Sequence, residues 1–164
     1  MTTETPTTDQ AFKRFSDTFD AEGLRAALAY LLRLTDFRFI AIFREHDGSA
    51  NTEVFYDREN PEVLATDERP DIATYCGYVR ETRNVFKTAD ALQDQRLDGH
   101  VSREAVQSYC GVPVMTAEGE VLASLCHWDE VPRDPEQVDL MLMLQVASWL
   151  AQRNLVVPYR HKTG

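Results

Sequence analysis

Three cysteines and four histidines are the residues of this sequence best suited to bind a metal or attack a substrate. The cysteines are Cys76, Cys110 and Cys126, and an odd number does not favour a disulfide framework. The histidines are dispersed, at positions 46, 100, 127 and 161. The sequence has no cysteine pair at zinc spacing, no His-Glu-x-x-His, no Walker-type glycine loop and no Gly-x-Ser-x-Gly. We therefore expect no metal site and no catalytic residues of these kinds.

Cys126 and His127 are the one pair of such residues that are adjacent in the chain. They lie in an apolar run, residues 120–128, which predicts a strand. Neighbouring residues of a strand point to opposite faces of its sheet. The two side chains are therefore not expected to share one pocket.

Hydrophobic periodicity predicts an α+β fold. A helix over 21–34, capped by Asp20, precedes the run 37–44, whose middle is apolar on both faces and predicts a central strand. Further strands are expected at residues 52–56, 85–87, 108–115 and 120–128, with a short helix after Asp71. This order predicts a mainly antiparallel sheet, with the terminal helices on one face and residues 58–107 covering the other. A sheet roofed by irregular structure favours a closed pocket.

The last helix is expected to start at Asp134-Pro135-Glu136-Gln137, which provides a cap, a proline and a capping-box glutamine, and to end near Arg153. Its residues form two apolar faces, although packing on a sheet needs only one. The second face, with Val146 and Trp149, predicts contact with the 21–34 helix or with the same helix of another subunit. We expect a homodimer through Val146 and Trp149.

Composition limits the classes of function. The 164 residues fit one domain, expected over 13–158, between flexible tails at 1–12 and 159–164. No stretch reaches the ~20 apolar residues of a membrane span, and residues 1–8 do not resemble a signal peptide. We therefore expect a soluble, cytoplasmic protein that does not bind membranes. The net charge of −10 and the scattered basic residues disfavour nucleic acid as a partner.

Two segments resemble the GAF domain family. Ser108-Tyr-Cys-Gly-Val-Pro-Val114, a polar turn and Val121-Leu-Ala-Ser-Leu-Cys-His-Trp-Asp129 match its aromatic residue, its Gly-Val-Pro and its strand that ends near an acidic residue. Upstream, Val79…Thr82…Val85, Asp90-Ala91 and Asp94…Arg96 also resemble the family. The resemblance covers roughly residues 20–155. It implies a six-stranded antiparallel sheet between terminal helices and a ligand pocket. GAF domains bind cyclic nucleotides, tetrapyrroles, haem or small metabolites, many dimerise, and most are parts of larger signalling proteins; an effector domain is not expected within this chain.

Subfamilies of GAF domains with known chemistry match less well. Bilin-binding members attach their pigment before the Gly-Val-Pro strand, where residues 98–107 contain no cysteine. The Asn-Lys…Phe…Asp-Glu signature of cyclic-nucleotide binders is missing. Free methionine sulfoxide reductases are the closer alternative, because Cys76-Gly77 and Asp98-Gly99-His100 resemble their motifs. Two thiols of that family, however, fall on Thr66 and Arg103, which disables the known route. A contact between Cys76 and Cys110 across the pocket is the remaining redox possibility, although buried cysteines are more often apolar fillers.

The pocket is expected to have an aromatic and apolar lining with a few polar groups. Its candidate residues are Tyr56, Tyr75, Cys76, Phe86, Leu97, His100, Arg103, Tyr109 and Val112. Arg103 could hold an anionic ligand by a bidentate contact. We therefore expect a sensory domain that binds a small organic ligand, without catalysis and without a cofactor. The alternatives are a thiol-dependent reductase and a dimerisation module whose pocket is filled by side chains.

Overall fold

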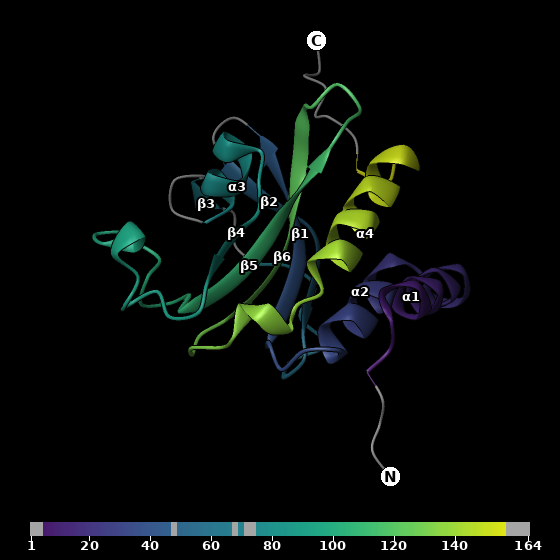
Figure 1. Ribbon diagram of the computed structural model, residues 1–164, viewed down its shortest axis with the longest axis horizontal. Helices are drawn as coiled ribbons and strands as arrows, with labels where there is room; N and C mark the ends of the chain where they lie inside the picture. Colours follow the sequence, from purple (N-terminus) through teal and green to yellow (C-terminus); the bar gives the residue numbers. More distant parts are fainter. Residues whose placement is uncertain (1–4, 47–48, 67–68, 71–74, 157–164) are drawn as a thin grey trace.

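The computed structural model describes residues 5–46, 49–66, 69–70 and 75–156 (Figure 1). These residues form an α+β fold, as the sequence predicts. In chain order, the elements are α1 (Thr8–Glu22), α2 (Leu24–Arg33), β1 (Phe39–His46), β2 (Ser49–Asp57), β3 (Arg69–Pro70), α3 (Cys76–Thr82), β4 (Phe86–Thr88), the 3-10 turn η2 (Gln95–Leu97), β5 (Ser108–Met115), β6 (Val121–Asp129), the 3-10 turn η3 (Pro135–Gln137) and α4 (Leu140–Gln152).

The strands form one sheet in the order β3-β2-β1-β6-β5-β4, and every neighbouring pair is antiparallel. The strand that the sequence predicts to be central, β1, lies between β2 and β6. Its residues alternate between two buried clusters, because successive side chains of a strand point to opposite faces. Ile40 and Ile42 face one cluster, whereas Phe39 and Ala41 face the other.

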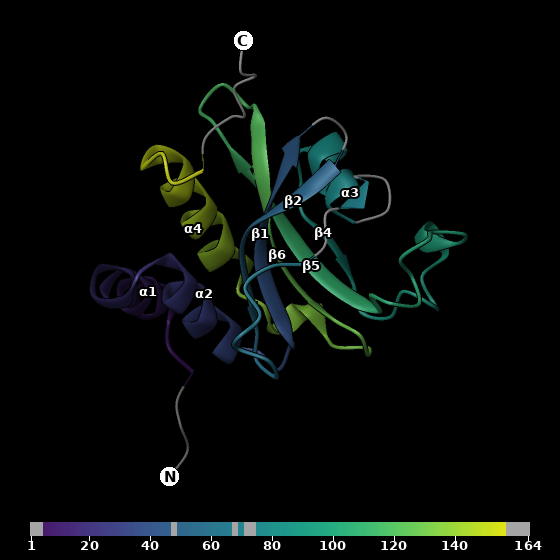
Figure 2. The ribbon, with the colours of Figure 1, turned by 180° about the vertical axis from the view of Figure 1, so that it is seen from behind.

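Two layers cover the sheet, one on each face. Helices α1, α2 and α4 lie on one side, and α3 with the segment 89–107 lies on the other (Figures 1 and 2). We call the corresponding clusters the helix-side core, which contains Leu28, Ile40 and Val146, and the roof-side core, which contains Phe39, Tyr109 and Trp128. The predicted placement of the terminal helices on one face is confirmed.

Helix α1 corrects the predicted N-terminal tail. Thr7 and Gln10 form a capping box, in which each side chain accepts a hydrogen bond from the other residue's backbone N–H. The helix therefore begins at Thr8, inside the predicted 1–12 tail, and runs past the predicted cap at Asp20. Gly23, at φ 95°, separates it from α2 in a backbone conformation that favours glycine.

The second apolar face of α4 is covered by α1 of the same chain. Phe12, Phe15 and Phe19 hold the Trp149 ring edge-on, with ring centroids 6.5, 5.1 and 4.9 Å away. Val146 is completely buried. Val146 is therefore used within one subunit, and Trp149 is partly covered by α1, whereas the predicted homodimer stays a prediction.

The start of α4 also differs from the prediction. Pro135–Gln137 forms a separate 3-10 turn, and Val138 is extended at φ −80° and ψ 124°. The Asp139 side chain then accepts a hydrogen bond from the Leu142 N–H and caps α4. A second good cap, five residues after Asp134, thus divides one predicted helix into a turn and a helix. No helix in the described part of the chain has both the length and the apolar character to cross a bilayer.

Candidate ligand-binding cavity

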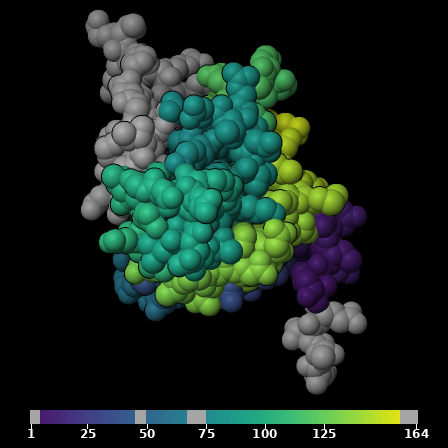
Figure 3. Space-filling model, turned by 60° about the vertical axis from the view of Figure 1, so that its left-hand side comes forward, coloured from purple at the N-terminus to yellow at the C-terminus, as the bar shows by residue number. Residues whose placement is uncertain are grey.

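A cavity of about 320 Å³ lies on the roof side of the sheet. This volume is near the lower end of the ~300–1,000 Å³ typical of ligand sites. The teal α3 and the segment that follows it form the surface on this side of the molecule (Figure 3). The described residues that line the cavity are Phe39, Phe43, Ala50, Thr66, Tyr75, Cys76, Ser102, Ala105, Val106, Tyr109, Trp128 and Glu130.

The sheet-side wall includes aromatic rings from β1, β5 and β6. Phe39 and Trp128 are directly paired across these strands, and their rings stack with centroids 5.0 Å apart. Phe43 extends the wall, with its ring centroid 5.4 Å from that of Trp128. Cross-strand aromatic pairs of this kind stabilise a sheet and fix the ring positions. The strand register therefore prepares a rigid, apolar surface.

Tyr109 of β5 is paired with Trp128 and continues this wall, and the Tyr75 ring, from the segment before α3, lies edge-on to it at 5.3 Å. The Tyr75 hydroxyl donates a hydrogen bond of 2.8 Å to the Val106 carbonyl. Burial raises the pKa of Tyr75 to about 12, so the phenol is neutral at physiological pH. The Tyr109 ring lies over Gly111, where a Cβ atom would come within 2.3 Å of the Tyr109 hydroxyl. Glycine at this strand position therefore makes room for the ring.

Two of the three cysteines lie in the roof-side core and the third lies in the helix-side core. The Cys76 sulfur lies 3.5 Å from the Tyr109 hydroxyl, and Cys126 is buried in the same cluster. Burial raises the pKa of the Cys126 thiol well above its usual value. Cys110 belongs to the helix-side core, where burial raises its pKa to about 12. The possible contact between Cys76 and Cys110 is therefore wrong, because alternation along β5 turns Cys110 away from the cavity.

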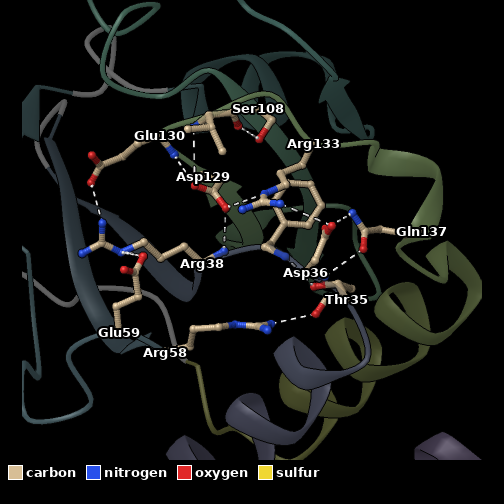
Figure 4. Close-up of polar contacts among 12 residues, drawn as sticks. Thr35, Asp36, Arg38, Arg58, Glu59, Ser108, Asp129, Glu130, Arg133 and Gln137 are labelled. Atoms are coloured by element: carbon tan, nitrogen blue, oxygen red, sulfur yellow. Dashed lines mark hydrogen bonds and ion pairs between the residues drawn. The ribbon is translucent and has the colours of Figure 1, made fainter. Parts of the chain in front are cut away.

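Asp129 organises the polar end of the cavity (Figure 4). One carboxylate oxygen accepts hydrogen bonds from the Arg38 backbone N–H at 3.0 Å and from Arg133 Nε at 2.9 Å. The other oxygen accepts from the Glu130 backbone N–H at 2.7 Å. The carboxylate thus joins the start of β1 to the end of β6 and fixes the backbone of Glu130, a residue of the cavity lining.

The Arg38 side chain brings three carboxylates together beside this end. Its guanidinium nitrogens lie 3.0 Å from Asp57, 3.1 Å from Glu59 and 3.2 Å from Glu130 (Figure 4 shows the last two residues). Burial alone would raise the pKa of the Asp57 carboxyl, but hydrogen bonds from Arg38, from the Glu59 backbone and from Asn60 lower it. The Asp57 carboxyl is therefore ionised, and one guanidinium is shared among three acidic side chains.

The structure places three of the predicted site residues on the cavity wall: Tyr75, Cys76 and Tyr109. Tyr56 and Val112 are wrong as pocket residues, because both face the helix side. The Arg25 guanidinium carbon lies 5.0 Å from the Tyr56 ring centroid, and Val112 is buried in the helix-side core. In each case the neighbouring residue, Phe55 or Gly111, faces the roof side instead.

Three predicted site residues, Phe86, Leu97 and His100, do not line the cavity. Leu97 and Phe86 pack in the roof-side core, and His100 packs against Tyr75 of the lining. The His100 ring lies 4.8 Å from that of Tyr75, and its Nδ1 accepts a hydrogen bond from the Ser102 N–H. Burial lowers the pKa of His100, which favours the neutral imidazole. These residues therefore belong to the same core but do not form the predicted ligand contacts.

Arg103 is not among the residues that line the cavity, so its predicted role as an anion anchor is wrong. Its guanidinium donates to the Leu92 carbonyl at 2.9 Å and lies 3.7 Å from an Asp98 oxygen. The segment predicted to cover this face of the sheet, residues 58–107, is also too long at its N-terminal end. Arg25 donates to the Pro61 and Val63 carbonyls, which ties that segment to α2.

Sequence reasoning missed most of the aromatic wall, and it missed Glu130. Phe39 and Phe43 alternate along β1 with the same parity, so a strand assignment alone could have placed them on one face. Trp128 and Glu130 follow from the end of β6, but their position at the cavity depends on the pairing of β6 with β1. Nowhere in the described ranges are three or more His, Cys, Asp or Glu side chains placed so that they could hold a metal ion.

Comparison with known proteins places this geometry in a family. The chain is 40% identical over 65 residues to the cyclic di-GMP phosphodiesterase PA2567 of Pseudomonas aeruginosa; the match covers 38% of the chain and 11% of that protein. The chain thus spans about a tenth of the length of this curated relative.

Solved structures share the fold at low sequence identity. The GAF domain of an Acinetobacter phosphoenolpyruvate-protein phosphotransferase has a TM-score of 0.70 at 13% identity, covering 91% of this chain and 93% of that one. A free methionine-R-sulfoxide reductase from Neisseria meningitidis, in complex with its substrate, has a TM-score of 0.69 at 14% identity, covering 93% and 91%. The family model described as "GAF domain" matches residues 21–153, and the chain therefore belongs to the GAF domain family.

Proposed function

We propose that this chain is a sensory module that binds a small organic molecule in the roof-side cavity and does not transform it. The observation that supports this most directly is the cavity itself, about 320 Å³ in volume with a largely aromatic lining. Membership of the GAF family supports a sensory or regulatory role. The relative with phosphodiesterase activity on cyclic di-GMP fits a place in signalling.

The cavity also bears on the dimerisation-module alternative. A domain that serves only to associate has no need for a hollow core, because a void forfeits contacts that a larger side chain would make. Small residues at the wall, Ala50, Ser102 and Ala105, leave the space open. A binding role therefore explains the lining better than a filled pocket does.

A second candidate function, thiol-dependent reduction, is favoured only by Cys76 on the wall and by the likeness to sulfoxide reductases. Thr66, where the family has a thiol, lines the cavity, and its hydroxyl lies 3.0 Å from that of Thr52. Arg103 occupies the position of that family's nucleophilic cysteine, and its guanidinium contacts the Leu92 carbonyl and Asp98. Because the buried Cys126 thiol is protonated, it offers little of the reactive thiolate.

Native mass spectrometry of the protein purified from cells tests the binding role. We expect a retained small molecule, and we expect Ala105→Phe to lose it because the added ring occupies the wall. Val101→Phe is the matched control, since Val101 is 77% exposed and does not line the cavity. Equal retention by both variants would mean that the molecule binds elsewhere.

An activity assay separates the two candidates. With free methionine sulfoxide and dithiothreitol, we expect the wild type to give no more turnover than a variant in which Cys76, Cys110 and Cys126 are all serine. Turnover that the wild type shows and the triple variant lacks would favour the reductase.

A further inference from the structure

We propose that the cavity takes a small organic cation, that is, a protonated or quaternary amine attached to an apolar or aromatic body. This inference rests on the proposed binding function and adds the chemical class of the ligand. Ring faces, an excess of carboxylates and the direction of the hydrogen bonds each support it.

Five aromatic rings line the cavity. Phe39, Phe43, Tyr109 and Trp128 line the cavity from the sheet, and Tyr75 lines it from the segment before α3. The faces of aromatic rings are electron-rich and attract cations within about 6 Å. Phe39 already makes such a contact, because the Arg38 guanidinium carbon lies 4.7 Å from its ring centroid. The wall thus suits both an apolar body and a positive group.

The formal charge at the cavity is negative. Glu130 is the one charged side chain among the described residues of the lining. Its partner Arg38 also contacts Asp57 and Glu59, so one guanidinium faces three carboxylates. An excess of two negative charges remains, which would attract a cation and repel an anion.

The arginines near the roof-side core have partners of their own. Arg103 is bound to the Leu92 carbonyl and Asp98, and Arg96 pairs with Asp94 at 2.6 Å. Arg80 lines an adjoining cavity of about 10 Å³, which is roughly the volume of one water probe. These contacts direct basic groups away from the main cavity.

Two hydrogen-bonding groups on the wall, the Tyr75 hydroxyl and the Glu130 carboxylate, act as acceptors toward a ligand. Tyr75 uses its hydroxyl proton on the Val106 carbonyl, so only its lone pairs face a ligand. The Glu130 carboxylate is also an acceptor. An ammonium group, which only donates, complements them.

Calorimetric titration of the full chain with three matched probes tests this inference. Phenethylamine is a cation at pH 7, 2-phenylethanol is neutral, and 3-phenylpropanoate is an anion. We expect the amine to bind about tenfold tighter than the alcohol, as one cation–π contact and one carboxylate provide, and the anion to bind most weakly. The preference for the amine should decrease as salt is added.

Charge variants test which carboxylate causes the preference for the amine. Glu130→Gln should weaken amine binding about tenfold and alcohol binding much less. Glu59→Gln is the matched control, because it also removes a carboxylate from Arg38 but does not line the cavity. It should change amine binding less than about twofold. Phe43→Leu keeps an apolar wall and should weaken the amine more than the alcohol.

The outcomes separate this inference from the proposed function. Equal affinity for amine and alcohol, tightest binding of the anion, or no binding of any probe would overturn the cationic class. In each case, a molecule that the wild type retains and Ala105→Phe loses would still support the sensory role. Circular dichroism of each variant checks that a lost signal is not a lost fold.

Discussion

At the scale of single residues, His127 shows how one buried side chain links folding to pH. The imidazole is 1% exposed and packs against Phe37 with ring centroids 5.9 Å apart. Its Nε2 has no hydrogen-bond partner among the described residues. Burial, and then the charge of Arg58, lowers its pKa to about 3. The folded protein therefore keeps this imidazole neutral at pH values where an unfolded chain would protonate it.

We predict that His127 makes the protein lose stability in mild acid. The unfolded histidine gains a proton below pH ~6.5, whereas the folded one does so only near pH 3. The stabilising difference is complete above pH ~6.5 and is lost as the pH falls, by at most about 1.4 kcal/mol per pH unit. Urea unfolding at pH 7.5, 6 and 5 should show a shallower pH dependence for His127→Phe than for the wild type. Parallel curves for the two proteins would contradict this.

Single residues also show where sequence reasoning about the site succeeds. Tyr75, Cys76 and Tyr109 follow from a short helix and from the strand with Gly-Val-Pro, and the structure places them on the wall. Tyr56 and Val112 fail because a residue-type argument does not assign a strand face. A shift of one residue along a strand exchanges its two faces. The face is known only when the pairing partners are known, and these are distant in sequence.

At the scale of elements, α1 explains the two apolar faces of α4. The spacing Phe12, Phe15 and Phe19 is that of a helical face, but it lies among polar residues. Its partner, Trp149, is some 130 residues away in the sequence. The sequence predicts that α4 has a second partner, but whether that partner is internal or another subunit depends on this long-range contact.

We predict that breaking the contact between α1 and α4 destabilises the fold and leaves the oligomeric state unchanged. Trp149→Ala removes three ring contacts and should cost about 3 kcal/mol in denaturant unfolding. Val146→Glu buries an unpaired carboxylate and should cost more, so it should give unfolded chains rather than soluble monomers. Met141→Glu is the control, because Met141 is 73% exposed, and should stay within about 0.5 kcal/mol of the wild type. A folded Val146→Glu protein whose sedimentation coefficient falls would instead support a contact between subunits.

At the scale of the whole molecule, one sheet separates two cores of different character. The helix-side core is mainly aliphatic and joins three helices to the sheet, whereas the roof-side core is smaller and richer in aromatic residues and contains the cavity. The sequence predicts this division, because the apolar centre of β1 requires cover on both faces. It does not predict the cavity, because a void depends on how side chains from β1, β6 and the roof fit together.

The two cores should differ in how easily they open. In the roof, many backbone hydrogen bonds are local, such as those from Arg103 to His100 and from Val106 to Ser102. Val101 is 77% exposed, so its side chain adds little buried apolar surface to this segment. We therefore predict that amides within 92–106 exchange hydrogen early, and that Ile40–Ile42, paired on both sides within the sheet, exchange last.

A ligand under the roof should change this pattern locally. It stabilises the closed form by RT ln(1 + [L]/Kd), about 2.7 kcal/mol at one hundred times Kd. With phenethylamine at saturation, hydrogen exchange followed by mass spectrometry should slow most in 75–82 and 92–106, where opening exposes the cavity. Local fraying of α1 should be unaffected, because that helix lies on the other face of the sheet. Ala105→Phe should remove the effect and Val101→Phe should keep it. Protection that rises only at the slowest amides of the sheet would mean that the amine binds without closing the roof.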